Sequence, residues 1–230
     1  MKKKRFLESI MAFILLASVY FLSQRGALAV ASLGVRSTEK IVIIDASHGG
    51  IDPGKVGANG ELEKEINLSI SIKLKALLEE QGIKVIMTRT SDSALYDENA
   101  KNKKSQDLQR RVEIIERTAP DIAVSIHQNS YGQESVYGPQ VFYFSNSATG
   151  RQLAISIQES MNSYLEIEKP REVKGNDSYY LLKNTSSPTV IVECGFLSNR
   201  EETQKLITEE YQNQIAEALL KGIMEYLDDI

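Results

Sequence analysis

Short runs of apolar residues alternate along this chain with longer stretches in which apolar residues recur every three or four positions. The short runs predict strands with little polar surface, and the longer stretches predict helices with one buried face. The predicted strands are Ile41–Asp45, Ile83–Met87, Ile122–Ile126, Gln140–Phe144 and Pro188–Val192. The predicted helices are Glu63–Gln81, Leu108–Arg117, Gln152–Leu165 and Glu201–Leu227, the last in one or two pieces. Gln140–Phe144 alternates less cleanly than the other strands and is placed at an edge of the sheet.

Strands that alternate with helices predict a single α/β domain, in which helices flank a mostly parallel or mixed central sheet. Between these elements, Thr88–Gln106 is polar and predicts an exposed loop, and Glu166–Asp177 predicts a mobile one. The loop after the first strand is rich in glycine. Such a loop either turns sharply and approaches another group closely, or is simply flexible.

The first 29 residues have a different pattern. Four basic residues, Lys2 to Arg5, precede the apolar stretch Ile10–Leu22, and Ala27-Leu28-Ala29 resembles a cleavage site. This layout predicts a signal peptide, with a retained membrane anchor as the alternative. We expect residues 1–29 to be this leader, 30–39 a linker, and 40–230 an exported, extracytoplasmic catalytic domain that is secreted or anchored.

Composition narrows the function classes. The 230-residue chain has a net charge of −4, so it lacks the basic surface of a nucleic-acid-binding protein. Its one cysteine, Cys194, allows neither an intrachain disulfide nor a cysteine-rich metal site.

The chain contains only two histidines, and both follow predicted buried strands. His48 comes just after Ile41–Asp45, and His127 follows Ile122–Ile126. In open α/β sheets ligands bind at the carboxyl ends of strands, and histidine is the commonest metal ligand. A single histidine is more often a hydrogen-bonded structural residue, but two in the same position favour a metal site.

Two carboxylates complete a candidate zinc centre. Catalytic zinc takes three protein ligands and keeps one position open, and His48, Glu63 and His127 can supply those three. Glu193 follows the strand Pro188–Val192 and is the candidate to accept a proton from the attacking water. The alternative is that Glu193 pairs with an arginine or caps a helix. The spacing matches no local zinc motif such as H-E-x-x-H.

Several motifs resemble those of the zinc-dependent N-acetylmuramoyl-L-alanine amidases. The family pattern D-P-G-H-G-G-x-D-P-G is similar to the segment from Asp45 to Gly54, with Ala46-Ser47 in place of Pro-Gly. The family's Glu-Lys pair, S-I-H-x-N and E-x-G-F-L-S-N resemble the segments that start at Glu63, Ser125 and Glu193. Thr88-Arg89, Asp92 and Leu108-x-x-Arg111 also match the family pattern. The sequence departs from that pattern at Ser130, where the family has alanine, and at Ile115-Glu116, where it commonly has Ala-Asn. The resemblance extends from about Lys40 to Leu227.

The resemblance implies an enzyme that hydrolyses the amide between the lactyl group of N-acetylmuramic acid and L-alanine of the peptidoglycan stem peptide. It implies one zinc ion per chain held by His48, Glu63 and His127, with Glu193 as the catalytic carboxylate. Asn129 and Arg111 are predicted substrate contacts, and Arg111 is equally suited to a structural ion pair.

The compact layout resembles the sporulation-type amidases, which act on spore cortex, and an activator or targeting protein is an expected partner. Two other function classes stay open at this point. One is another exported zinc peptidase that acts on stem peptides, and the other is a catalytically silent binding protein on the same fold.

Overall fold

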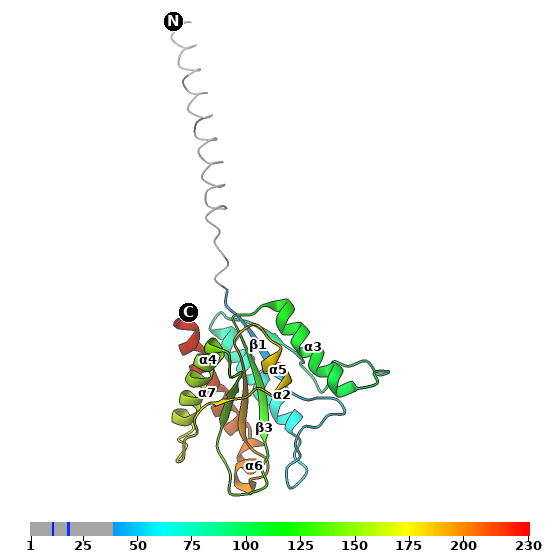
Figure 1. The fold of residues 1–230 in the computed structure, drawn as a ribbon. Coiled ribbons are helices and arrows are strands. Elements are labelled where there is room, and N and C mark those ends of the chain that lie inside the picture. The colour runs from blue at the N-terminus through cyan, green and yellow to red at the C-terminus, as the bar shows by residue number, and fades with distance from the viewer. Residues whose placement is uncertain (1–10, 12–17, 19–38) are drawn as a thin grey trace, which may run out of the picture. The chain divides into compact units, whose positions relative to one another are not determined.

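The computed structural model describes residues 39–230, together with Met11 and Ser18. Residues Glu39–Ile230 form one compact unit (Figure 1). The predicted leader and linker lie outside the described residues, apart from Met11, Ser18 and Glu39. Within the described part of the chain, no helix is both long and apolar enough to cross a membrane.

A six-stranded mixed sheet forms the centre of this unit, in the order β2-β1-β3-β6-β4-β5. Strands β2, β1, β3 and β6 run parallel, whereas β4 is antiparallel to β6 and parallel to β5. The strands are β1 (Ile41–Ala46), β2 (Lys84–Met87), β3 (Ile122–Asn129), β4 (Gln140–Tyr143), β5 (Lys174–Gly175) and β6 (Thr189–Phe196). The predicted α/β fold with a mixed sheet is therefore confirmed.

Side chains of the central strands alternate between two apolar cores. Val42 and Ile44 of β1 belong to the larger core, which they form with helices on one face of the sheet. Ile43 belongs to a smaller core on the other face, with Ile115 and Leu181. Successive residues of a strand point to opposite faces. Because both faces of these strands are buried in an apolar core, the strands are apolar at consecutive positions.

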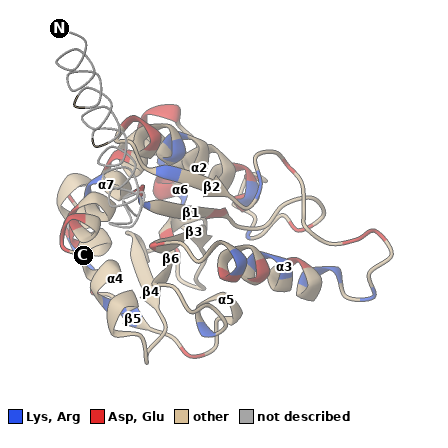
Figure 2. Cartoon of the chain, turned by 90° about the horizontal axis from the view of Figure 1, so that it is seen from above, with Lys and Arg blue, Asp and Glu red and all other residues tan. Residues whose placement is uncertain are grey.

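The helices divide between these two faces unequally. Helices α2 (Glu63–Glu80), α4 (Ala148–Tyr164) and α7 (Glu209–Asp228) cover the larger core, and α3 (Lys103–Thr118) and α5 (Tyr180–Lys183) cover the smaller one. Figure 2 shows α3 and α5 on the side of the sheet away from α7. A short helix, α6 (Arg200–Leu206), follows β6.

Several element boundaries differ from the predictions. Strands β3 and β6 continue past Ile126 and Val192, because the backbone pairing persists from His127↔Glu193 to Asn129↔Phe196. His127 and Glu193 therefore lie within strands, and the prediction that each follows the end of its strand is wrong. Strand β4 is not at the edge, because the two-residue β5 pairs with it.

Helix α3 begins five residues before the predicted start, inside the segment predicted as a loop. Its first turn is polar and is stabilised by a cap, in which the Asn102 side chain accepts a hydrogen bond from Ser105 N. The last predicted helix is indeed two helices, α6 and α7. Helix α5 was not predicted, because four residues are too few to show a helical period.

Candidate active site

His127 and Glu193 occupy paired positions on the adjacent strands β3 and β6. His127 lies four residues after Ala123, and Glu193 two residues after Ile191, so each points to the same sheet face as that residue of the smaller core. Both side chains therefore extend from the sheet face that α3 and α5 cover. The side chain of Gln128 points to the opposite face, where its Nε2 donates to Asn67 Oδ1 of α2.

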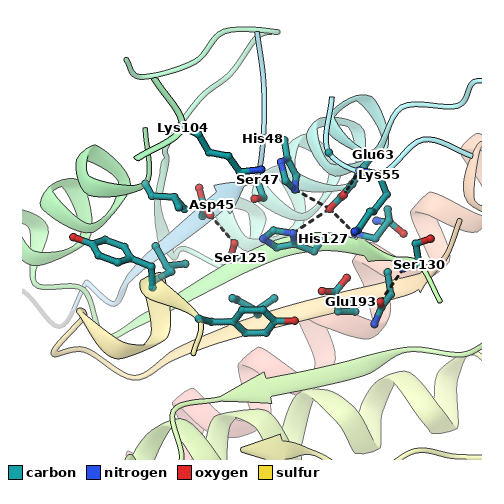
Figure 3. A pocket seen from close by; sticks show the side chains of 18 residues that line it. Asp45, Ser47, His48, Lys55, Glu63, Lys104, Ser125, His127, Ser130 and Glu193 are labelled. Carbon is teal, nitrogen blue, oxygen red and sulfur yellow. Dashed lines mark hydrogen bonds and ion pairs between the residues drawn. The ribbon is translucent and has the colours of Figure 1, made fainter. Parts of the chain in front are cut away.

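His48 and Glu63 reach the same place by different routes. His48 follows β1 in a left-handed backbone conformation, with φ of 64°. Glu63 is the first residue of α2, and the intervening loop folds it back over the carboxyl end of the sheet. In Figure 3 both side chains and His127 point toward one another.

The three side chains converge on a single point. Glu63 Oε1 lies 3.2 Å from His48 Nε2 and 3.0 Å from His127 Nδ1. One ligand atom from each residue lies within 4.8 Å of the other two, as a shared metal ion requires. The predicted ligands are thus brought together, although residues 48, 63 and 127 are far apart in the sequence.

Neighbouring groups fix the orientation of this triad. Asp52 Oδ2 lies 2.9 Å from His48 Nδ1, so the other ring nitrogen is directed at Glu63. The Glu63 carboxylate accepts hydrogen bonds from the backbone N–H groups of Lys55, at 2.7 Å, and Gln128, at 3.0 Å. A carboxylate that orients a ligating imidazole is common around protein metal sites.

Gly54 allows the glycine-rich loop to pass close to the triad. A Cβ at this position would lie 2.5 Å from Glu63 Oε2, and the backbone φ is +70°. Of the two readings that the sequence allowed, close approach therefore holds at this glycine.

Arg89 connects the loop to the fold. Its guanidinium donates to the carbonyl oxygens of Ala46, Ser47 and Lys64, at 2.7 Å, 3.1 Å and 2.7 Å. These carbonyls belong to the end of β1, the residue before His48 and the start of α2. One side chain thus sets the position of His48 relative to Glu63.

Arg111 is buried beneath the site, with only 1% of its side chain exposed. It forms ion pairs with Asp45 and Asp107 and donates to the His48 carbonyl oxygen at 2.8 Å. Burial raises the pKa of Asp45, but Arg111 and hydrogen bonds from Ser125 and Thr88 outweigh it and lower that pKa to about 2. These contacts favour the ion-pair role of Arg111 over substrate contact.

Glu193 faces the triad, and one of its two carboxylate oxygens, Oε2, has no hydrogen-bond partner among the described residues. The residue is 7% exposed. Burial raises its pKa to about 7, with the charges of His127 and His48 opposing this and that of Glu63 adding to it. Neither the helix-capping nor the arginine-pairing alternative is seen for Oε2.

The charges within the triad are strongly coupled. Burial acts to lower the pKa of His48, but hydrogen bonds to Asp52 and Glu63 and their charges raise it to about 9. Burial raises the pKa of Glu63, but hydrogen bonds and charge from both histidines lower it overall. The arrangement therefore stabilises positive charge at this point, and a metal cation can take the place of the proton.

A cavity of about 440 Å³ opens over these residues. It is lined by the triad and Glu193, by Lys55 and Lys104, and by Asn129. Asn129 Oδ1 accepts a hydrogen bond from Ser130 N at 2.8 Å. Asn129 thus lies where a bound substrate would be, whereas Arg111 does not line the cavity.

Sequence reasoning assigned no role to Asp52, Asn67 or Arg89, although all three hold the triad in place. Asp52 lies four residues from His48 and inside the motif-like segment from Asp45 to Gly54, but neither signal specifies its contact with the imidazole. The carbonyls that Arg89 contacts are visible only once the loop is folded.

The fold and the site together define an α/β protein with a candidate metal-binding catalytic centre at the carboxyl ends of its parallel strands. Residues 42–225 match the N-acetylmuramoyl-L-alanine amidase family, and the chain belongs to that family.

Individual relatives agree with this. The chain is 34% identical over 233 residues to the germination-specific N-acetylmuramoyl-L-alanine amidase of Bacillus subtilis, covering 99% of this chain and 97% of that protein. It is similar to the CwlD amidase of Clostridioides difficile, solved in complex with the GerS lipoprotein, with 42% identity and a TM-score of 0.81. That match covers 83% of this chain and 100% of that one. A second Clostridium difficile amidase shares 31% identity at a TM-score of 0.75, over 83% of this chain and 98% of that one.

Proposed function

We propose that this protein hydrolyses the amide bond between the lactyl group of N-acetylmuramic acid and the L-alanine of the peptidoglycan stem peptide. The observation that carries the proposal is the convergence of His48, Glu63 and His127 in one cavity with Glu193, whose buried Oε2 has no hydrogen-bond partner among the described residues. The family match supports the same bond as the site of cleavage.

We propose zinc as the metal, one ion per chain. Zinc bonds of about 2.0–2.2 Å to nitrogen and oxygen place neighbouring ligand atoms of a tetrahedron roughly 3.3–3.6 Å apart. Glu63 Oε1 lies 3.2 Å and 3.0 Å from the two imidazole nitrogens, slightly closer than those separations. Two imidazoles and one carboxylate without a thiolate are also a donor set of catalytic zinc sites.

When bound, zinc polarises water and the carbonyl of the scissile amide. The protein residues carry the remaining steps. Glu193 takes the proton from the attacking water and returns it to the amide nitrogen of the departing L-alanine. In the metal-free site, burial raises the pKa of this carboxyl, so Glu193 holds a proton more readily than an exposed glutamate does. Asn129 contacts the substrate, and Arg111 positions the His48 backbone through their hydrogen bond.

The test is hydrolysis of a defined muramoyl peptide by the full chain, with zinc and after chelation. We expect an intact stem peptide with a free L-alanine amine, in the zinc-loaded protein only. Cleavage inside the stem peptide would identify another peptidase instead, and absence of cleavage with zinc bound would identify a silent protein.

We further propose that the substrate is spore-cortex peptidoglycan and that a protein partner assists the enzyme. The germination-specific relative and the complex of the similar CwlD amidase with GerS support these two points. Deletion of the gene in a spore-forming host should leave stem peptides attached throughout the cortex.

Residues 1–29 are proposed to export the catalytic domain, by cleavage or as an anchor. Sequencing the mature N-terminus decides between these: a start near Val30 shows cleavage, and an intact Met1 in the membrane fraction shows an anchor.

A further inference from the structure

The cavity over Glu193 adjoins a second one of about 290 Å³, beside the first turn of α3. Lys104, Leu108 and Tyr180 line both cavities. The two cavities therefore form one groove that leads away from the triad between α3 and α5. Asn102 and Ser105 line its far end.

Lys104 lies where the two cavities meet, and its side chain is 68% exposed. Its Nζ lies 3.5 Å from Asp52 Oδ2, the atom that also lies 2.9 Å from His48 Nδ1. Figure 3 shows the side chain extending toward His48. A cation in the first turn of a helix is disfavoured by the helix dipole, so helix stability does not explain a lysine here.

We propose that this groove binds the stem peptide beyond the scissile amide, and that Lys104 pairs with the free carboxylate of the second stem residue. The proposal rests on the proposed function. A second stem residue that is a glutamate linked through its γ-carboxyl keeps its α-carboxylate free. Each extended residue spans roughly 3.5 Å. The Lys104 ammonium contacts Asp52, which in turn contacts the candidate metal ligand His48. The second stem residue therefore lies within reach of Lys104.

The floor of the groove suits a peptide better than a free anion. Leu108 and Tyr180 present apolar surface between the two cavities, and Tyr180 is 41% exposed. The L-alanine methyl group and the extended backbone can lie over that surface while the carboxylate faces Lys104. We therefore expect a peptide with the free carboxylate to bind more tightly than an otherwise identical peptide without it.

Lys55 is the competing cation, because it lines the first cavity but not the second. If the stem peptide left the site on that side, Lys55 and not Lys104 would read the carboxylate. Lys103 provides a matched control, because it precedes Lys104 in α3, lies over the Tyr96 ring and lines neither cavity.

The experiment measures the binding of muramoyl tripeptides to the zinc-loaded full chain. The chain carries Glu193→Gln, so that the peptides are not cleaved during the measurement. Two muramoyl tripeptides are compared that differ only at the second stem residue, glutamate in one and its α-amide in the other. We expect the glutamate form to bind about two- to fivefold more tightly, as a partly exposed ion pair allows. Adding Lys104→Gln should remove that difference, whereas adding Lys103→Gln should preserve it.

Equal affinity for the two peptides would overturn the proposal, and so would loss of the difference in Lys55→Gln but not in Lys104→Gln. Turnover by the chain with Glu193 intact separates this outcome from failure of the proposed function. If that chain cleaves both peptides but does not distinguish them, the activity stands and the groove assignment is wrong. If it cleaves neither, the binding data still decide the groove.

Discussion

Replacing Glu193 by glutamine separates proton transfer from metal binding. Glutamine has nearly the same volume, but it cannot accept a proton from water at neutral pH. Glu193 is not one of the three converging ligands, so the variant should keep its zinc. General acid–base catalysis contributes about 10²–10⁴-fold, and a group that acts in both proton transfers should lie at the upper end.

The effect on stability has a definite sign. The pKa of Glu193 rises from 4.5 to about 7 on folding, so the folded state holds this proton more tightly than the unfolded state. The contribution of Glu193 to the stability of the zinc-free protein should therefore fall as pH rises from about 4.5 to 7. At 1.36 kcal/mol per pKa unit, this one group costs about 3 kcal/mol above that range. Glutamine removes that cost, so zinc-free Glu193→Gln should be the more stable protein at about pH 8 and equal to wild type at about pH 4.

The assays are zinc content, release of free L-alanine amine, and urea unfolding of the chelated protein at both pH values. Glu202→Gln is the matched control, because Glu202 is also 7% exposed but accepts hydrogen bonds from Gly138 N and Phe196 N. An amide cannot accept at both positions, so this control should lose about 1–3 kcal/mol of stability. The fraction that stays folded should retain its activity.

Near-normal turnover by Glu193→Gln would refute the assigned mechanism, even with zinc still bound. Loss of zinc from that variant would refute the separation of ligand and base. A fall in stability at about pH 8 would restore the ion-pair or capping role for this residue.

Three further substitutions test the site and its support. His127→Ala should sharply lower zinc content by metal analysis, and unchanged content would remove that residue from the ligand set. Gly54→Ala should weaken zinc binding in a titration, because the new Cβ would meet Glu63. Gly60→Ala is its control, with φ of +94° but nothing within 4 Å, so equal zinc affinities would contradict this reason. Arg111→Met should destabilise the fold by about 3–5 kcal/mol in urea unfolding, because the buried Asp45 carboxylate loses its charged partner; unchanged stability with a raised KM would restore substrate contact.

The sequence by itself determined the central strands and the candidate residues of the site. Runs such as Ile41–Ile44 are apolar at every position, which is typical of a strand buried on both faces, and α2 has apolar residues at helical spacing. The two histidines were recognisable because the chain has no others and both follow such runs, and Glu193 because it follows the apolar run Pro188–Val192.

The tertiary structure decided where polar strands end and which residues hold the site in place. Residues 127–129 read as the end of a strand, yet β6 continues to pair with them, and pairing between distant segments leaves no local signal. The first turn of α3 shows no apolar period because its side chains face solvent and the groove, not the core.

The same reason applies to Arg89 and Arg111. Both act through backbone carbonyls or carboxylates that come close only when β1, α2 and α3 pack together. A local pattern encodes burial and periodicity, whereas a hydrogen bond between residues 43 or 63 positions apart depends on the complete fold.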